Sequence, residues 1–281
     1  MVRPPAIAGA WYPGSEPALR EAIEGYLDPI RPAELPGRVT ALICPHAGYA
    51  YSGPTAAHAY AQVRASPGAF RRVVLMGPLH RPIWGSRLGA FMVPAEDAYH
   101  TPLGDVPLDR AFIDALGRKV TLSPVRGDQE HSLEIQLPFL QVVLGGFSMV
   151  PIMLGEHIAE PGAAARVEGL ATALAELADE GTLFVASTDL SHMDQYAEVV
   201  RTDRRLVELV AAFDVDGLSA ALQAEQVQAC GATGLVAALR TTQKSGARGA
   251  QPLAYAASGD VTGDKRPGTY TVGYLAAAVY S

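Results

Sequence analysis

Residues 39–53 read VTALICPHAGYAYSG, and this stretch decides the fold. Its first part, up to Cys44, is a mostly apolar run of the length of a strand. A run without regular polar alternation is typical of a strand that is buried on both faces of a sheet. The chain then turns through Pro45, His46 and Gly48, so a histidine follows directly on a buried strand.

The same pattern recurs along the chain, where apolar runs that predict strands alternate with amphipathic segments that predict helices. The predicted strands cover residues 39–44, 72–76, 89–93, 148–154, 183–187, 253–257 and 270–278. The predicted helices cover residues 15–27, 54–63, 108–116, 163–178, 196–212 and 230–242, with a further helix after the segment 128–138. This order predicts an α/β fold with a predominantly parallel central sheet that helices cover on both faces. The last two strands are expected to form an antiparallel pair at its edge.

Composition narrows the class of protein. Of 281 residues, 49% are hydrophobic and 18% charged, so we expect one α/β domain over residues 1–281 with a large core. A net charge of −7 without a block of Lys and Arg argues against nucleic acid as a partner. We expect no membrane association, since no apolar run approaches the ~20 residues of a bilayer span and no signal peptide is recognised. Two cysteines form no disulfide framework, which predicts a cytoplasmic protein with reduced thiols.

Candidate functional side chains follow three of the predicted strands. His46 follows the strand at 39–44, His80 ends the motif MGPLH, and Asp189 and His192 belong to the motif STDLSH. In parallel α/β sheets, ligands bind outside the carboxyl ends of the strands. We therefore expect these side chains to share one cleft, as a metal site or as an acid–base site.

Cys230 lies in the motif QACGATG, where a predicted helix begins. The unpaired N–H groups and the dipole of a helix start favour a thiolate, which is also the form that binds metals. Asp189 and His192 are three residues apart and share a face if that turn is helical. The carboxylate would then fix the tautomer of the imidazole and raise its basicity.

We expect ordinary structural roles for the remaining histidines and for Cys44. Surface or hydrogen-bonded positions are expected for His58, His100 and His157. Cys44 is expected to be a buried apolar residue of its strand. In DQEHSLEIQLP (128–138) the acidic residues favour a helix cap, with His131 kept as an alternative pocket wall. Tyr49, Tyr51 and Trp84 are candidates for an aromatic wall of the same pocket.

Taken in order, PHAGYAYSG, GPLH, EHSLEIQLP, STDLSH and CGATG resemble the Memo family, whose prokaryotic members are also called AmmeMemoRadiSam system protein B. AGAWYPG near the start and YTVGYLAAAVY near the end fit as well, so the resemblance covers nearly the whole chain. It implies a three-layer α/β/α fold similar to class III extradiol dioxygenases, with a predominantly parallel or mixed sheet.

The resemblance also implies a site. It makes His46, His80 and Cys230 metal ligands and gives His192 the role of acid and base beside Asp189. Two histidines and an anionic ligand with open positions suit Fe(II), while Cu and Zn remain alternatives. The sequence departs from animal members, because GPLHR has one histidine where they have a pair and CGATG lacks their following basic residues.

The implied function is that of an Fe(II)-dependent dioxygenase or oxidoreductase. Its expected partners are O₂, a small, phenolic substrate and proteins of the radical-SAM system. Two alternatives stay open at this point. One is a zinc-dependent hydrolase, and the other is a non-catalytic module that binds a peptide or a metal.

Overall fold

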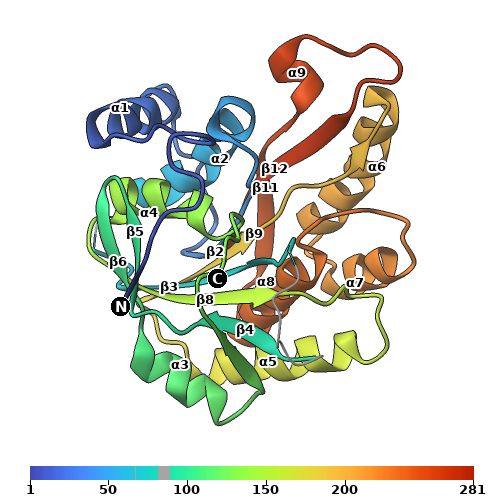
Figure 1. Ribbon diagram of the computed structural model, residues 1–281. Coiled ribbons are helices and arrows are strands. Elements are labelled where there is room, and N and C mark those ends of the chain that lie inside the picture. The colour runs from blue at the N-terminus through green and yellow to red at the C-terminus, as the bar shows by residue number, and fades with distance from the viewer. Residues whose placement is uncertain (67, 82–88) are drawn as a thin grey trace.

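The computed structural model describes residues 1–66, 68–81 and 89–281, and in these residues the main sheet has nine strands. The strand order is β10-β12-β2-β9-β3-β8-β4-β7, and β11 pairs with β12 (Figure 1). The strands of this sheet are β2 (Val39–Cys44), β3 (Arg72–Pro78), β4 (Phe91–Pro94), β7 (Leu122–Val125), β8 (Ser148–Leu154), β9 (Thr182–Ser187), β10 (His192–Met193), β11 (Gly249–Ala257) and β12 (Thr271–Tyr280). A small second sheet contains β1 (Val2–Arg3), β5 (Ala98–Thr101) and β6 (Gly104–Pro107).

The centre of the main sheet is parallel. Strand β9 pairs in parallel with both β2 and β3, and β3 pairs in parallel with β8. Every residue of β9 is buried, which explains why its sequence shows no polar alternation. The predicted antiparallel pair of β11 and β12 is confirmed. However, β12 lies inside the sheet, because it also pairs antiparallel with β2.

Helices cover both faces of the sheet. Figure 1 shows α1, α2 and α4 on one side and α3, α5 and α8 on the other. The helices are α1 (Glu16–Leu27), α2 (Tyr49–Arg64), α3 (Arg110–Gly117), α4 (Leu137–Leu144), α5 (Ala163–Leu177), α6 (Tyr196–Ala211), α7 (Val215–Gln223), α8 (Ala232–Lys244) and α9 (Ser258–Thr262), with a 3₁₀ turn η1 (Glu134–Gln136). The predicted three-layer α/β/α class is confirmed. In the described part of the chain, each helix is too short or too polar to cross a bilayer.

Sequence patterns misplaced some element boundaries. Helix α2 starts at Tyr49 instead of near Pro54, so the loop that carries His46 is short. The proline lies in the second turn of α2 and was misread as its start. Trp84, a predicted pocket wall, lies outside the described residues.

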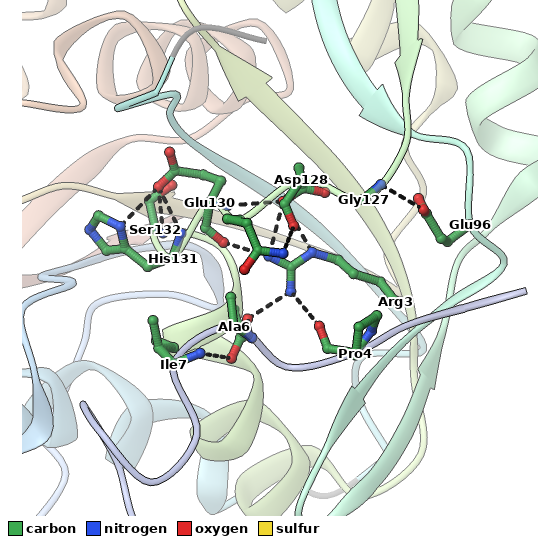
Figure 2. A network of polar contacts seen from close by, with 12 residues as sticks. Arg3, Pro4, Ala6, Ile7, Glu96, Gly127, Asp128, Glu130, His131 and Ser132 are labelled. Atoms are coloured by element: carbon green, nitrogen blue, oxygen red, sulfur yellow. Dashed lines mark hydrogen bonds and ion pairs between the residues drawn. The ribbon is translucent and has the colours of Figure 1, made fainter.

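A buried arginine fastens the first residues of the chain to the segment before α4. Arg3 is fully buried, and its Nε and Nη2 donate to Asp128 Oδ1 at 3.0 and 2.9 Å. Its Nη1 donates to Glu134 Oε2 at 2.6 Å, and the Tyr12 hydroxyl donates to Glu134 Oε1 at 2.8 Å. Figure 2 shows Arg3 extending towards Asp128, with Glu130 and His131 following along the same segment. These ion pairs therefore support the backbone that carries His131.

We predict that Arg3→Ala lowers the free energy of unfolding by about 3–5 kcal/mol, because it leaves the carboxylates of Asp128 and Glu134 buried without their cation. Urea unfolding of the two proteins measures the difference. The control is Arg20→Ala, which removes an exposed pair with Glu16 and should cost at most about 0.5 kcal/mol. Equal losses in both variants would contradict the role given to Arg3.

Candidate metal centre

Three histidines from separate segments meet at the carboxyl ends of the central strands. His46 follows β2, His80 follows β3, and His131 precedes η1. Each offers a ring nitrogen, and these nitrogens all lie within 4.8 Å of one another. The rings of His80 and His131 stack with centroids 4.5 Å apart, and His46 stands edge-on to both. This cluster could hold a metal ion.

Two histidines of the cluster, His46 and His131, suit ligation because burial lowers the pKa of each imidazole. Burial, with the neighbouring histidines, lowers the pKa of His46 well below its usual value. Burial also lowers the pKa of His131 to about 4. Both imidazoles are therefore neutral at pH 7, and neutral imidazole is the form that binds metals. The sequence pattern at 128–138 favoured a helix cap, and His131 instead belongs to the cluster and lines the adjoining cavity.

Cys230 lies against His46, one member of this cluster, although the group of ligand atoms that all lie within 4.8 Å of one another in the described residues contains the three histidines without this sulfur. Its Sγ is 3.1 Å from His46 Nε2, and the backbone N–H of Asp189 donates to Sγ at 3.2 Å. Gly231 makes this approach feasible, since a Cβ at that position would lie 2.5 Å from the carbonyl oxygen of Ser187. Cys230, predicted as a ligand from its place at a helix start, thus lies beside the predicted ligand His46.

The prediction that the helix start favours a thiolate is wrong for the protein alone. Helix α8 begins at Ala232, two residues after the cysteine. Burial raises the pKa of the Cys230 thiol well above its usual value, and the charge of Asp189 raises it further. A bound cation would reverse this preference, because a thiol that coordinates a metal loses its proton.

The spacing of Cys230 and His46 fits a shared ion. Sulfur at about 2.3 Å and nitrogen at about 2.0–2.1 Å from one metal lie roughly 3.1 Å apart when their bonds make an angle of about 90°. The Sγ–Nε2 separation is 3.1 Å. Nitrogen and thiolate donors together suit iron, copper or zinc better than magnesium or calcium.

Glu130 orients the ring of His80 and holds the backbone of His131. Its Oε1 lies 2.9 Å from His80 Nδ1, which leaves Nε2 of that ring for a ligand, and it accepts from the His131 backbone N–H at 2.9 Å. Burial opposes ionisation, but hydrogen bonds from His80 and from the backbone of Ser132 lower the pKa of Glu130 to about 2. Carboxylates that bind the far nitrogen of a ligating histidine fix its tautomer and its orientation. Sequence reasoning missed this role, because an acidic residue before a helix has the same pattern as a cap.

Asp189 and His192 do not form the expected pair. Oδ1 of Asp189 accepts a hydrogen bond from the backbone N–H of His46 at 2.7 Å. Burial raises the pKa of Asp189 to about 7, although the backbone N–H groups of His46 and Ala47 oppose the shift. The ring of His192 instead bonds through Nδ1 to the Tyr270 hydroxyl at 2.8 Å. The helical turn assumed between them is absent, since His192 begins the short strand β10.

A cavity of ≈ 720 Å³ adjoins the cluster and is lined by all three histidines, Asp189 and His192. Its aromatic wall includes Tyr51, as predicted, together with Trp11 and Tyr270, which sequence reasoning had not singled out. These three aromatic side chains are unusually exposed for their size. A second cavity of ≈ 480 Å³ contains His80, His192 and Cys230, so the cluster is reached from two sides.

The other predicted residues lie apart from the cluster. Tyr49 is buried and donates its hydroxyl to the Ile135 carbonyl, so it is not a cavity wall. Cys44 is fully buried in β2, as predicted. His100 is exposed and bonds to Asp105. Neither His58 nor His157 belongs to the histidine cluster of the described residues, although His157 lines the second cavity.

The fold and the site together define an α/β protein with a candidate metal centre at the carboxyl edge of its sheet. A family model described as "Memo-like protein" matches residues 3–278. The chain is 37% identical to a MEMO1 family protein of Methanopyrus kandleri over 98% of each chain. It is 37% identical to one of Thermotoga sp. strain RQ2 and 32% identical to one of Methanococcoides burtonii, each over at least 99% of both chains. The chain therefore belongs to the Memo-like family.

We predict that Glu130→Gln raises the dissociation constant for Co(II), used as a probe metal, about 10- to 100-fold, because an amide has one acceptor oxygen where the carboxylate accepts with both, from Nδ1 of His80 and from its backbone N–H. Competition with a chelator measures the constant. The control is Glu96→Gln, a buried carboxylate that accepts from the Gly127 N–H and has no bond to the described histidines. Loss of affinity in both variants to the same extent would contradict the assignment.

Proposed function

We propose that this protein is an oxidoreductase that uses a non-haem Fe(II) ion and O₂ to oxidise a small, phenolic substrate. The observation that carries the proposal is the cluster of His46, His80 and His131 with the Cys230 sulfur beside it, at the strand ends. His46, His80 and Cys230 are the proposed ligands. His131 is the nearest alternative third donor. When bound, Fe(II) supplies the redox chemistry that O₂ requires and keeps open positions for substrate.

The residues around the proposed ion have separate tasks. His192 lines both cavities, and its Nδ1 is held by Tyr270, so Nε2 is the atom that exchanges a proton with the substrate. Asp189 fixes the loop of His46 through the backbone N–H, which is a structural task. The rings of Trp11, Tyr51 and Tyr270 offer apolar faces and edges to a planar substrate.

The identity of the metal separates this proposal from its main alternative. Zinc in the same site would favour a hydrolase, in which His192 activates a water molecule. The cytoplasmic location stays a prediction from the cysteine content, and partner proteins of the radical-SAM system stay a prediction from the family resemblance. A non-catalytic role in binding a peptide is the other alternative. It predicts that the protein binds the peptide equally well after its metal is removed.

We predict that His46→Ala, His80→Ala and Cys230→Ala each lower the metal content of protein purified without oxygen, because each removes a proposed ligand. Elemental analysis of the folded variants is the measurement, and it also identifies the metal. The controls are His58→Ala, His100→Ala and His157→Ala, which should keep the wild-type content. Full occupancy in all three ligand variants refutes the assignment. Loss of metal in His131→Ala together with full occupancy in Cys230→Ala would replace the thiolate by a third imidazole.

We predict that His192→Ala keeps its iron and binds nitric oxide, yet loses about 10²–10⁴-fold in turnover once a substrate is found. The reason is that its ring faces the cavities while its Nδ1 is bound to Tyr270, outside the ligand set. Anaerobic iron loading followed by nitric-oxide spectroscopy measures the open site without a substrate. A variant that cannot be loaded with iron would make His192 a ligand and leave the proton transfer without an assigned residue.

A further inference from the structure

A buried chain of hydrogen bonds leads away from the ring of His46, on the side opposite Cys230. It passes from His46 through Ser187 and Gln136 to Tyr60, and each of these four residues is at most 2% exposed. His46 Nδ1 lies 3.1 Å from Ser187 Oγ, and Gln136 Nε2 lies 2.8 Å from the same oxygen. No charged group belongs to this chain, in contrast to the carboxylate that orients His80.

The direction of each bond follows from the donors and acceptors available. The Pro45 carbonyl lies 2.9 Å from Gln136 Nε2 and can only accept, so it assigns the nitrogen of the amide to this side and leaves Oε1 to accept from the Tyr60 hydroxyl at 2.6 Å. The amide nitrogen of Gln136 therefore faces the site. It donates one hydrogen to the Pro45 carbonyl at 2.9 Å and the other to Ser187 Oγ at 2.8 Å. Both hydrogens of the amide are thus used.

Ser187 has one hydroxyl hydrogen, and it is also used. The hydroxyl donates to the Ser132 carbonyl at 2.6 Å, which accepts only. The oxygen of Ser187 can then only accept, so the bond to His46 requires a hydrogen on Nδ1. The opposite tautomer would set the lone pairs of Nδ1 and Oγ against each other in a buried place, where an unmade hydrogen bond is costly.

We infer that Ser187 and Gln136 are positioning residues that keep the proton of His46 on Nδ1 and its Nε2 unprotonated. Nε2 is the nitrogen that faces the sulfur of Cys230 at 3.1 Å. The chain therefore prepares His46 as a metal donor before a metal arrives. This inference rests on the proposed metal centre for its purpose, but the tautomer is a property of the protein alone.

Nuclear magnetic resonance of the full-length chain labelled with ¹⁵N-histidine, without added metal, tests the inference. Nitrogen shifts in long-range ¹H–¹⁵N spectra distinguish a protonated ring nitrogen from a bare one, and comparison with His46→Gln assigns the signals. We expect the wild type to carry the proton of His46 on Nδ1. In Ser187→Ala we expect a mixture of tautomers and a dissociation constant for Co(II) raised about 10- to 100-fold.

The matched control is Ser191→Ala, another buried serine near the site, whose Oγ has no hydrogen-bond partner among the described residues. It should change neither the tautomer nor the affinity. The inference would be overturned if His46 of the wild type carried its proton on Nε2. It would also be overturned if His46 kept the same tautomer in Ser187→Ala. If Ser187→Ala does not fold, the wild-type spectrum still decides. If the wild type binds no Co(II), the proposed function fails while the spectrum continues to test the tautomer.

Discussion

The site depends on the parallel pairing of β2, β9 and β3 in the middle of the sheet. Cys44 of β2 is paired with Ser187 of β9, so both strands end at the same level. His46 and Asp189, two residues beyond this pair, therefore meet, and the backbone N–H of the histidine bonds to the carboxylate. A slip of one residue in this register would move His46 and Asp189 apart along the strands by about 3.3 Å, so the pairing of β2 with β9 fixes the geometry of the site.

Around this frame, buried polar groups fix the direction of two of the imidazoles. Glu130 bonds to the ring of His80 and to the backbone N–H of His131, and the neutral chain through Ser187 holds the ring of His46. The backbone of Glu130 is itself tied down, because its carbonyl accepts from Nη2 of Arg3 at 2.7 Å. The first residues of the chain thereby support a site that is distant in sequence. Buried polar groups of this kind stabilise the fold only when all their hydrogen bonds are made, because an unpaired buried polar group is costly. The hydrogen bonds along the chain from Tyr60 to His46 are all made.

Much of this arrangement follows from the sequence. The apolar runs before His46, His80 and Asp189 predict buried strands, and parallel strands must bring their ends together, so the cleft was predictable. The role of Glu130 was not, since a helix cap and a histidine-orienting carboxylate share one sequence pattern. Tyr270 was missed because its partner strand β10 is two residues long and carries no periodicity. The expected pairing of Asp189 with His192 failed for a related reason, because spacing alone cannot distinguish a helical turn from an extended segment.

The central claim is that one metal ion binds at the strand ends between His46, His80 and Cys230. Anomalous X-ray diffraction at the iron absorption edge, on crystals of the protein loaded with Fe(II) without oxygen, tests it most directly. The account predicts a single strong peak about 2.0–2.3 Å from Nε2 of both histidines and from the sulfur. No peak at this position, or a peak bound by other residues, would contradict it.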